Sequence, residues 1–255
     1  MKQEFAEQAI VLKVGVFREA DCWVRLVSEQ KGLLTAFAFG GFRSRRRFCG
    51  CLDPFSLVHF RFSSNATGKY LYLNEGTLLE RFTGLRKNMA RLGMAVNCLK
   101  FVEAAHPGAQ GSGTAYPLLL ETLRLLDSEA AVPAVLPLLF RARLTFEQGY
   151  RPELTRCNSC GLDFRGSDRV CFALEQGRVF CPGCMHRDSD SRGNRAVLLF
   201  GAALAAVQDI LGQPLEEWGH AVHGKGIPRE CLRALDSYVQ YHMGLQWQGT
   251  GFQKT

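Results

Sequence analysis

Four cysteines stand in two pairs whose spacing is typical of a metal site. Cys157 and Cys160 are separated by two residues, Cys181 and Cys184 by two more, and 20 residues lie between the pairs. Two residues between thiolates allow one tight turn to present both sulfurs to one ion, with sulfur about 2.3 Å from zinc. The spacing therefore predicts a four-cysteine Zn2+ site.

The residues between the two pairs predict the small sheet of a zinc ribbon. Apolar residues alternate in the run VCFALEQGRVF on both sides of Gln176-Gly177, as they do in a β-hairpin. Four thiolates fill the tetrahedral positions of a zinc ion and leave none for water, so we expect one structural ion. Because so short a loop buries little core of its own, metal binding should contribute most of its folding free energy.

Other interpretations of the cysteines stay open. A redox role for the CxxC pairs would need an activated thiol in a thioredoxin-like βαβ unit, and no such pattern surrounds them. The N-terminus has two glutamates before its first apolar run, unlike a signal peptide, so we expect a cytoplasmic protein without disulfides. Cys171 is expected to be a small buried residue, and His186 is a rival to Cys184 as a ligand.

A second segment combines arginines with phenylalanines. In TAFAFGGFRSRRRFCGCLDPF, residues 35–55, five phenylalanines are interleaved with four arginines. Unpaired nucleic acid is bound by this combination, since cations neutralise phosphates while exposed rings stack on bases. No acidic residue lies between Gln30 and Leu52, so we favour phosphate contacts over a solvated loop. The basic candidates in this region are Lys31, Arg43, Arg45, Arg46 and Arg47.

The phenylalanines of this segment have two possible places. Phe37 and Phe39 stand at alternate positions of an expected strand, where the core of a barrel is favoured over a stacking surface. Phe42 and Phe48 flank the arginine run, and one of them is expected to be exposed.

Charge and motifs restrict the class of protein. The formal net charge is +7, and residues 1–156 hold 21 basic against 14 acidic side chains, whereas residues 157–255 hold 10 of each. The whole excess is N-terminal, so an anionic partner is expected there. No run of about eighteen apolar residues predicts a membrane span. The phosphate loop Gly-x4-Gly-Lys-Ser/Thr, HExxH and GxSxG are all missing, so we expect no enzyme.

The period of the apolar residues changes near residue 85. Before it, apolar and polar residues alternate in short runs separated by turn residues, which predicts an N-terminal OB-type β-barrel. The expected strands are 9–17, 22–29, 32–42, 55–62 and 69–80. After it, a period of 3.6 residues predicts an all-α domain. The expected helices are 85–105, 114–127, 133–149, 195–211 and 231–245.

The predicted fold class is multidomain α+β, with a barrel followed by helices that are interrupted by the ribbon. The boundaries expected are an OB-fold nucleic-acid-binding domain over 1–82, a helical domain over 83–155 and 191–250, a zinc-ribbon insert over 156–190, and a disordered tail over 251–255.

The order of several motifs resembles the RecO family of bacterial recombination mediators. They are AIVLKVGVFREADCWVRLVSEQKGLL, GGFRSRRRF followed by LDPF, LLERFTGLRKN, GYRPELTRCNSCG and CPGC, and they span nearly the whole chain. The resemblance implies a DNA-binding protein that consumes no nucleotide and anneals complementary strands. It further implies binding to single- and double-stranded DNA, and help in loading RecA onto DNA coated by single-strand-binding protein, usually with RecR.

The resemblance also assigns residues. The family's basic loop matches Arg43, Arg45, Arg46 and Arg47, with Lys31 in the preceding turn and Arg61 and Lys69 as further candidates. All four zinc ligands match. The family's site for the C-terminal tail of single-strand-binding protein lies on the helical domain, where Arg124, Arg141 and Arg143 are candidates and an ordinary helix edge is the alternative. Two other functions stay open: a nucleic-acid enzyme with a structural ribbon, and an adaptor whose basic loop binds an acidic protein.

Overall fold

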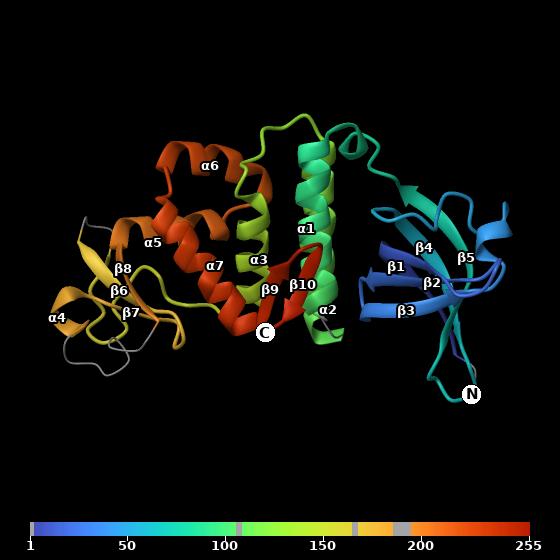
Figure 1. Ribbon diagram of the computed structural model, residues 1–255, viewed down its shortest axis with the longest axis horizontal. Helices are drawn as coiled ribbons and strands as arrows, with labels where there is room; N and C mark the ends of the chain where they lie inside the picture. The colour runs from blue at the N-terminus through green and yellow to red at the C-terminus, as the bar shows by residue number, and fades with distance from the viewer. Residues whose placement is uncertain (1–2, 106–108, 165–167, 186–194) are drawn as a thin grey trace. The chain divides into compact units, whose positions relative to one another are not determined.

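The computed structural model describes residues 3–105, 109–164, 168–185 and 195–255 of the chain (Figure 1). The chain divides into two compact units, Met1–Glu129 and Ala130–Thr255. Among the described residues, no helix is both long and apolar enough to cross a lipid bilayer.

Five strands close into a β-barrel in the first unit, drawn from blue to cyan in Figure 1. They are β1 (Glu4–Val16), β2 (Cys22–Ser28), β3 (Gly32–Ala38), β4 (Leu57–Ser64) and β5 (Leu71–Glu80). Around the barrel the order is β1-β2-β3-β5-β4, with β4 paired back to β1 and with β3 and β5 parallel. This OB-like topology confirms the barrel that the alternating runs predicted.

Strand β3 places small side chains inside the barrel and large ones outside. Ala36 and Ala38 are fully buried in the barrel core, whereas Phe39 is 47% exposed. Since successive side chains of a strand point to opposite faces, Phe37 lies on the outer face as well. The expectation that Phe37 and Phe39 belong to the core is therefore wrong. Two phenylalanines of β4 already fill the narrow interior, so that β3 contributes alanines there.

The segment between β3 and β4 contributes to the same core. It begins with a 3-10 turn, η1 (Gly41–Arg43), and then places Phe48 and Cys51 inside the barrel. Phe42 is 50% exposed, which confirms that one of the two rings flanking the arginines faces solvent. Buried side chains thus hold the segment in place while its arginines stay outside.

Two antiparallel helices complete the first unit. After the turn η2 (Leu85–Lys87), they are α1 (Met89–Ala105) and α2 (Ala109–Asp127). Arg91, near the start of α1, donates a 3.2 Å hydrogen bond to the carbonyl of Leu126 near the end of α2. In α1, Leu99 and Val102 are buried, whereas Met89 in the first turn is 78% exposed.

Helix α2 packs on strands β2 and β3 of the barrel. The Tyr116 hydroxyl donates a hydrogen bond to Gln8 Oε1 at 3.1 Å, and Asp127 accepts one from the backbone N–H of Leu85 at 2.8 Å. Helices α1 and α2 fall in the same compact unit as the barrel. The residues expected to form one helical domain, 83–155 and 191–250, are therefore divided between the two units.

Helices form most of the second unit. They are α3 (Leu136–Glu147), α5 (Gly201–Gly212), the turn η4 (Leu215–Glu217), α6 (Trp218–Lys225) and α7 (Arg229–Met243). Pro137 lies in the first turn of α3, where its missing N–H costs nothing, so the helix starts after Pro133. Helix α3 packs against α7 and α5, and Trp218 is fully buried.

A three-stranded sheet carries the cysteine-rich insert. Its strands are β6 (Arg169–Ala173), β7 (Arg178–Phe180) and β8 (Ala196–Phe200) in the order β7-β6-β8, and the short helix α4 (Pro182–Met185) follows β7. The predicted hairpin is confirmed, with Gly177 at φ 64° in its turn. Strand β8 corrects the helix expected from residue 195, because its short apolar run pairs with β6 before α5 begins at Gly201.

The C-terminal residues form a hairpin, β9 (Leu245–Gln248) and β10 (Gly251–Lys254), which corrects the disordered tail expected over 251–255. Gly249 at φ 59° supplies the positive φ that a two-residue hairpin turn requires. The rings of Trp247 and Phe252 lie 5.0 Å apart across the two strands, a cross-strand aromatic pair that stabilises the hairpin.

Candidate functional site

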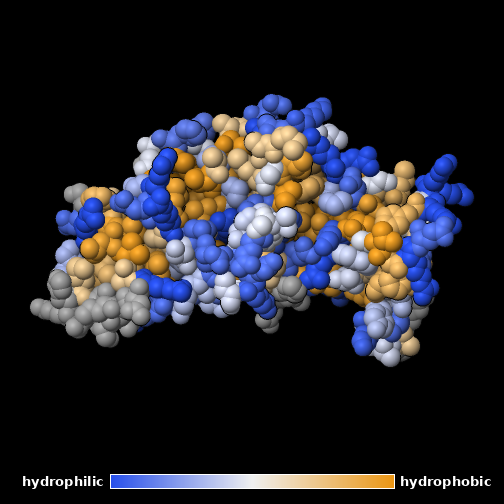
Figure 2. Space-filling model, in the orientation of Figure 1, coloured by the Kyte–Doolittle hydropathy of each residue, from blue (hydrophilic) through white to orange (hydrophobic). Residues whose placement is uncertain are grey.

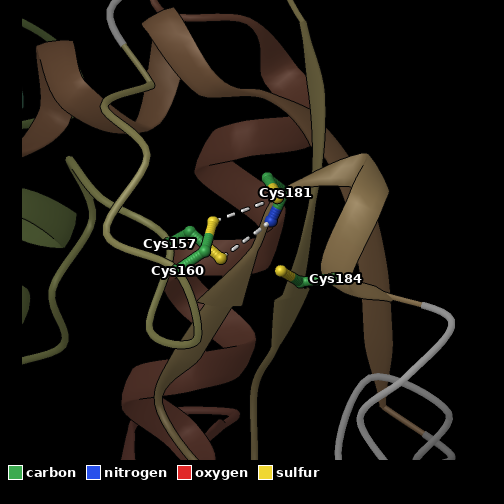
Figure 3. Close-up of side chains that lie close together, drawn as sticks. All are labelled: Cys157, Cys160, Cys181 and Cys184. Atoms are coloured by element: carbon green, nitrogen blue, oxygen red, sulfur yellow. Dashed lines mark hydrogen bonds between the residues drawn. The ribbon is translucent and has the colours of Figure 1, made fainter.

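The structure brings together the four cysteines of the two CxxC pairs (Figure 3). Cys157 and Cys160 lie on a turn that Gly161 closes by donating its N–H to the Cys157 carbonyl at 2.9 Å. Cys181 follows β7 and Cys184 lies in α4, so a loop and a strand end face each other with their sulfurs between them. All four Sγ atoms lie within 4.8 Å of one another. The cluster could therefore hold a metal ion.

The distances and the hydrogen bonds of the cluster suit a tetrahedral ion. The Sγ atoms of Cys160 and Cys181 are 3.6 Å apart, while sulfurs that share one zinc at 2.3 Å are separated by about 3.8 Å. The N–H of Cys181 donates to Cys157 Sγ at 3.3 Å. Burial opposes ionisation of Cys157, but backbone N–H groups from Cys181, Cys160 and Ser159 outweigh it and lower its pKa to about 6. A thiolate, which is the form that binds metals, is thus already favoured at one position.

Two further residues bear on the ligand set. Cys171 is 2% exposed in the small core of the ribbon sheet, as expected for a structural residue, and burial raises the pKa of its thiol. His186, the rival ligand, lies outside the described residues.

The arginine segment, residues 43–47, lies between β3 and β4. Arg45 and Arg46 are exposed, and their side chains make no hydrogen bond or ion pair with any residue that the structure describes. Arg43 forms an ion pair with Glu19 of the β1–β2 loop. Figure 2 shows hydrophilic side chains gathered at the barrel's edge, where the segment between β3 and β4 runs, with hydrophobic surface beside them.

Backbone contacts fix the arginine segment to the barrel. The Gly40 N–H donates to Asp21 Oδ1 at 2.7 Å, and the Phe42 N–H to the Ala20 carbonyl at 3.2 Å, so the residues that precede the segment are joined to the β1–β2 loop. On the other side, the Gly76 N–H of β5 donates to the Arg47 carbonyl at 2.8 Å. The arginines therefore project from an ordered support.

The other basic candidates are placed at separate positions on the barrel. Lys31, in the β2–β3 turn, lies 4.6 Å from the ring centroid of Phe5. Lys69, in the β4–β5 turn, lies 5.6 Å from the ring of Tyr70. Arg61 on β4 forms an ion pair of 3.1 Å with Glu75 on β5, which neutralises it.

Aromatic side chains line the outer surface of the barrel beside the arginine segment. We call them the outer aromatic row: Phe17, Phe37, Phe39, Tyr70 and Tyr72. The ring centroids are 5.1 Å apart for Phe17 and Phe37, 6.3 Å for Phe37 and Tyr70, and 5.5 Å for Phe39 and Tyr72. Sequence reasoning missed Phe17, Tyr70 and Tyr72. The signal available was that Phe17-Arg18 and Lys69-Tyr70 each join a ring to a cation next to a turn.

The three arginines considered for a partner's acidic tail are engaged within their own units. Arg124 pairs with Glu80. Arg141 pairs with Asp236 at 2.7 Å and is only 12% exposed. Arg143 donates to the Leu211 and Gln213 carbonyls at the end of α5, at 2.7 and 3.0 Å. These contacts favour the alternative of ordinary helix edges.

Comparisons with known proteins identify the family. A family model described as "Recombination protein O N terminal" matches residues 1–82, and one described as "Recombination protein O C terminal" matches residues 86–249. A DNA repair protein RecO of Solidesulfovibrio magneticus is 46% identical over 250 residues, which cover 98% of each chain. The DNA repair protein RecO of Nitratidesulfovibrio vulgaris is 42% identical over 254 residues, and that of Lawsonia intracellularis is 32% identical over 256 residues; both matches cover 98% of this chain and 99% of the relative.

These matches extend over both compact units, and they agree with the OB-like barrel, the helices and the cysteine cluster already described. The names describe recombination and DNA repair proteins rather than catalysts, in agreement with the expectation that the chain is not an enzyme. The chain belongs to the RecO family of DNA repair proteins.

Proposed function

We propose that this chain is a recombination mediator that acts on DNA in the cytoplasm. In this proposal it binds single- and double-stranded DNA, anneals complementary strands and helps to load RecA onto DNA coated by single-strand-binding protein, together with RecR. Family membership and the OB-like barrel support a role in DNA repair. The observation that carries DNA binding is the pair of exposed guanidinium groups of Arg45 and Arg46, which have no partner among the described residues and lie on an anchored segment.

The electrostatics of the segment explain how annealing can proceed without nucleotide hydrolysis. Two complementary strands repel each other through their phosphates, and cations that contact both strands remove part of that repulsion. Arg45 and Arg46 are available for phosphate directly. Arg43 exchanges Glu19 for phosphate at little cost, since exposed ion pairs contribute about 0–1 kcal/mol. Arg47, Lys31 and Lys69 add positive charge around the same barrel, and Arg61 contributes least because Glu75 neutralises it.

We further propose that the four cysteines hold a single structural Zn2+. Four thiolates leave no open position on the ion, so its contribution is to tie the turn of residues 157–161 to the end of β7 and to α4. The ribbon sheet then continues through β8 directly into α5. Binding energy at the cluster thereby stabilises the second unit.

The contacts with RecR and with the C-terminal tail of single-strand-binding protein rest on family membership. Because the three candidate arginines are engaged in ion pairs and in a helix cap, we assign no residue to the tail.

An annealing assay tests the proposed function. Complementary oligonucleotides are precoated with single-strand-binding protein and mixed with this protein in the absence of ATP. We expect duplex to form faster than without the protein, and the Arg45→Ala/Arg46→Ala variant to lose most of this acceleration. Equal rates with and without the protein would contradict the proposal, and shortened strands in the presence of a divalent metal would favour the nuclease alternative.

A further inference from the structure

We propose that the outer aromatic row is a stacking surface for the bases of an unpaired polynucleotide strand. This inference rests on the proposed DNA binding and specifies which form of the nucleic acid the barrel prefers. The rings are exposed, the barrel supports them, and cations lie beside them.

Three rings of the row are strongly exposed to solvent. Phe17 and Phe39 are each 47% exposed, and Tyr70 is 45% exposed. Burying apolar area stabilises the fold by about 25 cal/mol per Å2. A large ring that is half exposed therefore gives up part of this hydrophobic stabilisation. Three exposed rings on the outer surface of one barrel, whose core is already filled, indicate a surface that binds a ligand or a partner.

Ring contacts and the strands of the barrel hold the row in place. The ring of Phe37 packs edge-on against those of Phe17 and Tyr70, at 5.1 and 6.3 Å, and the ring of Phe39 packs on that of Tyr72 at 5.5 Å. Phe37 projects from β3, which pairs with β2 on one side and with β5 on the other. The row therefore collects side chains from the β1–β2 loop, from β3 and from the β4–β5 turn on one support, so little side-chain entropy is lost when a flat ligand binds.

Cationic side chains lie beside the rings of the row. The guanidinium of Arg18 lies 5.3 Å from the Phe17 ring, and the ammonium of Lys69 lies 5.6 Å from the Tyr70 ring. Arg47 donates to the Phe39 carbonyl at 2.6 Å. An apolar protein partner would leave these cations without a counter-charge, whereas a strand of nucleic acid offers flat bases to the rings and phosphates to the cations.

Access to the faces of the bases distinguishes an unpaired strand from a duplex as a ligand of these rings. In a duplex the faces of the bases are covered by their neighbours, and only phosphates reach the barrel. In an unpaired strand the bases can turn outward onto the rings. The surface therefore favours unpaired strands, while the arginine segment binds single strands and duplexes through the phosphates that they share.

The experiment compares three ligands: an oligothymidylate, an abasic strand of the same length and charge, and a duplex. We expect the Phe39→Ala and Tyr70→Ala variants to weaken oligothymidylate binding about 5- to 150-fold for each ring that stacks on a base. Their affinities for the abasic strand and the duplex should stay unchanged, because neither presents free bases. Met89→Ala, which removes another exposed apolar side chain of the same unit, is the matched control.

Conservative variants separate stacking from bulk. Phe39→Leu keeps an apolar side chain but removes the ring, so it should behave like Phe39→Ala, while Phe39→Trp should retain binding. Thermal unfolding of each variant shows whether the barrel is intact, and Tyr70→Leu in the β4–β5 turn repeats the test if a Phe39 variant is unstable.

If the ring variants weaken binding of all three ligands equally, or of none of them, the stacking inference is wrong. DNA binding by the arginine segment is a separate result, because the Arg45→Ala/Arg46→Ala variant should weaken all three ligands whatever the rings do.

Discussion

The guanidinium of Arg47 donates a 2.6 Å hydrogen bond to the carbonyl oxygen of Phe39. Its second nitrogen reaches the carbonyl of Asn74 at 3.5 Å, and its side chain passes 5.0 Å from the ring of Phe48. One arginine therefore connects the arginine segment to the end of β3 and to β5. It differs from Arg45 and Arg46, whose exposed side chains have no partner among the described residues.

Because Arg47 forms these hydrogen bonds, the Arg47→Lys variant should lower the stability of the barrel without changing the contribution of the positive charge to DNA binding. Lysine keeps the positive charge, but its ammonium cannot reproduce the planar fork that reaches two carbonyls. We expect the free energy of unfolding to fall by about 1 kcal/mol, while the salt dependence of DNA binding keeps its slope. Denaturant unfolding and DNA titrations over a series of salt concentrations measure the two effects. A flatter salt slope with unchanged stability would show that the hydrogen bonds of Arg47 do not hold the segment.

Neutralising Glu19 should strengthen DNA binding. Glu19 is the partner of Arg43, and both side chains are mostly exposed. In the Glu19→Gln variant the guanidinium of Arg43 is free and one repulsive charge is removed, so affinity for single strands at low salt should rise by a few-fold, as expected for an exposed ion pair of about 0–1 kcal/mol.

Glu75→Gln is the comparison for that variant, because it frees Arg61 in the same way at a different place on the barrel. A rise with Glu19→Gln and no rise with Glu75→Gln would place the DNA near the β1–β2 loop. The reverse result would move the interface to Arg61 and count against the arginine segment.

Removing a cysteine ligand should release the metal and destabilise the second unit. Cys157→Ser and Cys181→Ser each remove one of four donors, so we expect zinc content to fall and the unfolding transition of Ala130–Thr255 to shift to lower temperature. The barrel has its own core and should keep its transition. Cys171→Ser is the matched control, since that thiol is buried in the ribbon sheet outside the cluster of four. Full zinc content in the Cys157→Ser/Cys181→Ser double variant would refute the ligand set.

The cysteine cluster could be predicted from the sequence because its chemistry is local. Two residues between thiols define a turn, and Gln176-Gly177 defines the hairpin that returns the second pair to the first. The barrel strands were equally accessible from their alternation. Strand β8 was not, because a five-residue apolar run next to an alanine-rich helix fits a strand and a helix alike.

The face of β3 could not be read from the sequence for a different reason. Ala36 and Ala38 form one apolar set and Phe37 and Phe39 the other, so alternation alone does not say which set faces the core. The alanines face the core because other large side chains fill the barrel interior and leave no volume there for the two phenylalanines. The pairing of Arg43 with Glu19 was also hidden, since 24 residues separate them and only the closure of β1–β2 against η1 brings them together.

The measurement that tests the central claim most directly is the salt dependence of single-strand binding by the Arg45→Ala/Arg46→Ala variant. Each phosphate contact contributes about 0.7 to the slope of log affinity against log salt. Two lost contacts should therefore flatten the slope by about 1.4 and weaken binding at low salt, with thermal stability unchanged because both side chains are exposed. A slope and affinity equal to those of the unmodified protein would contradict the account.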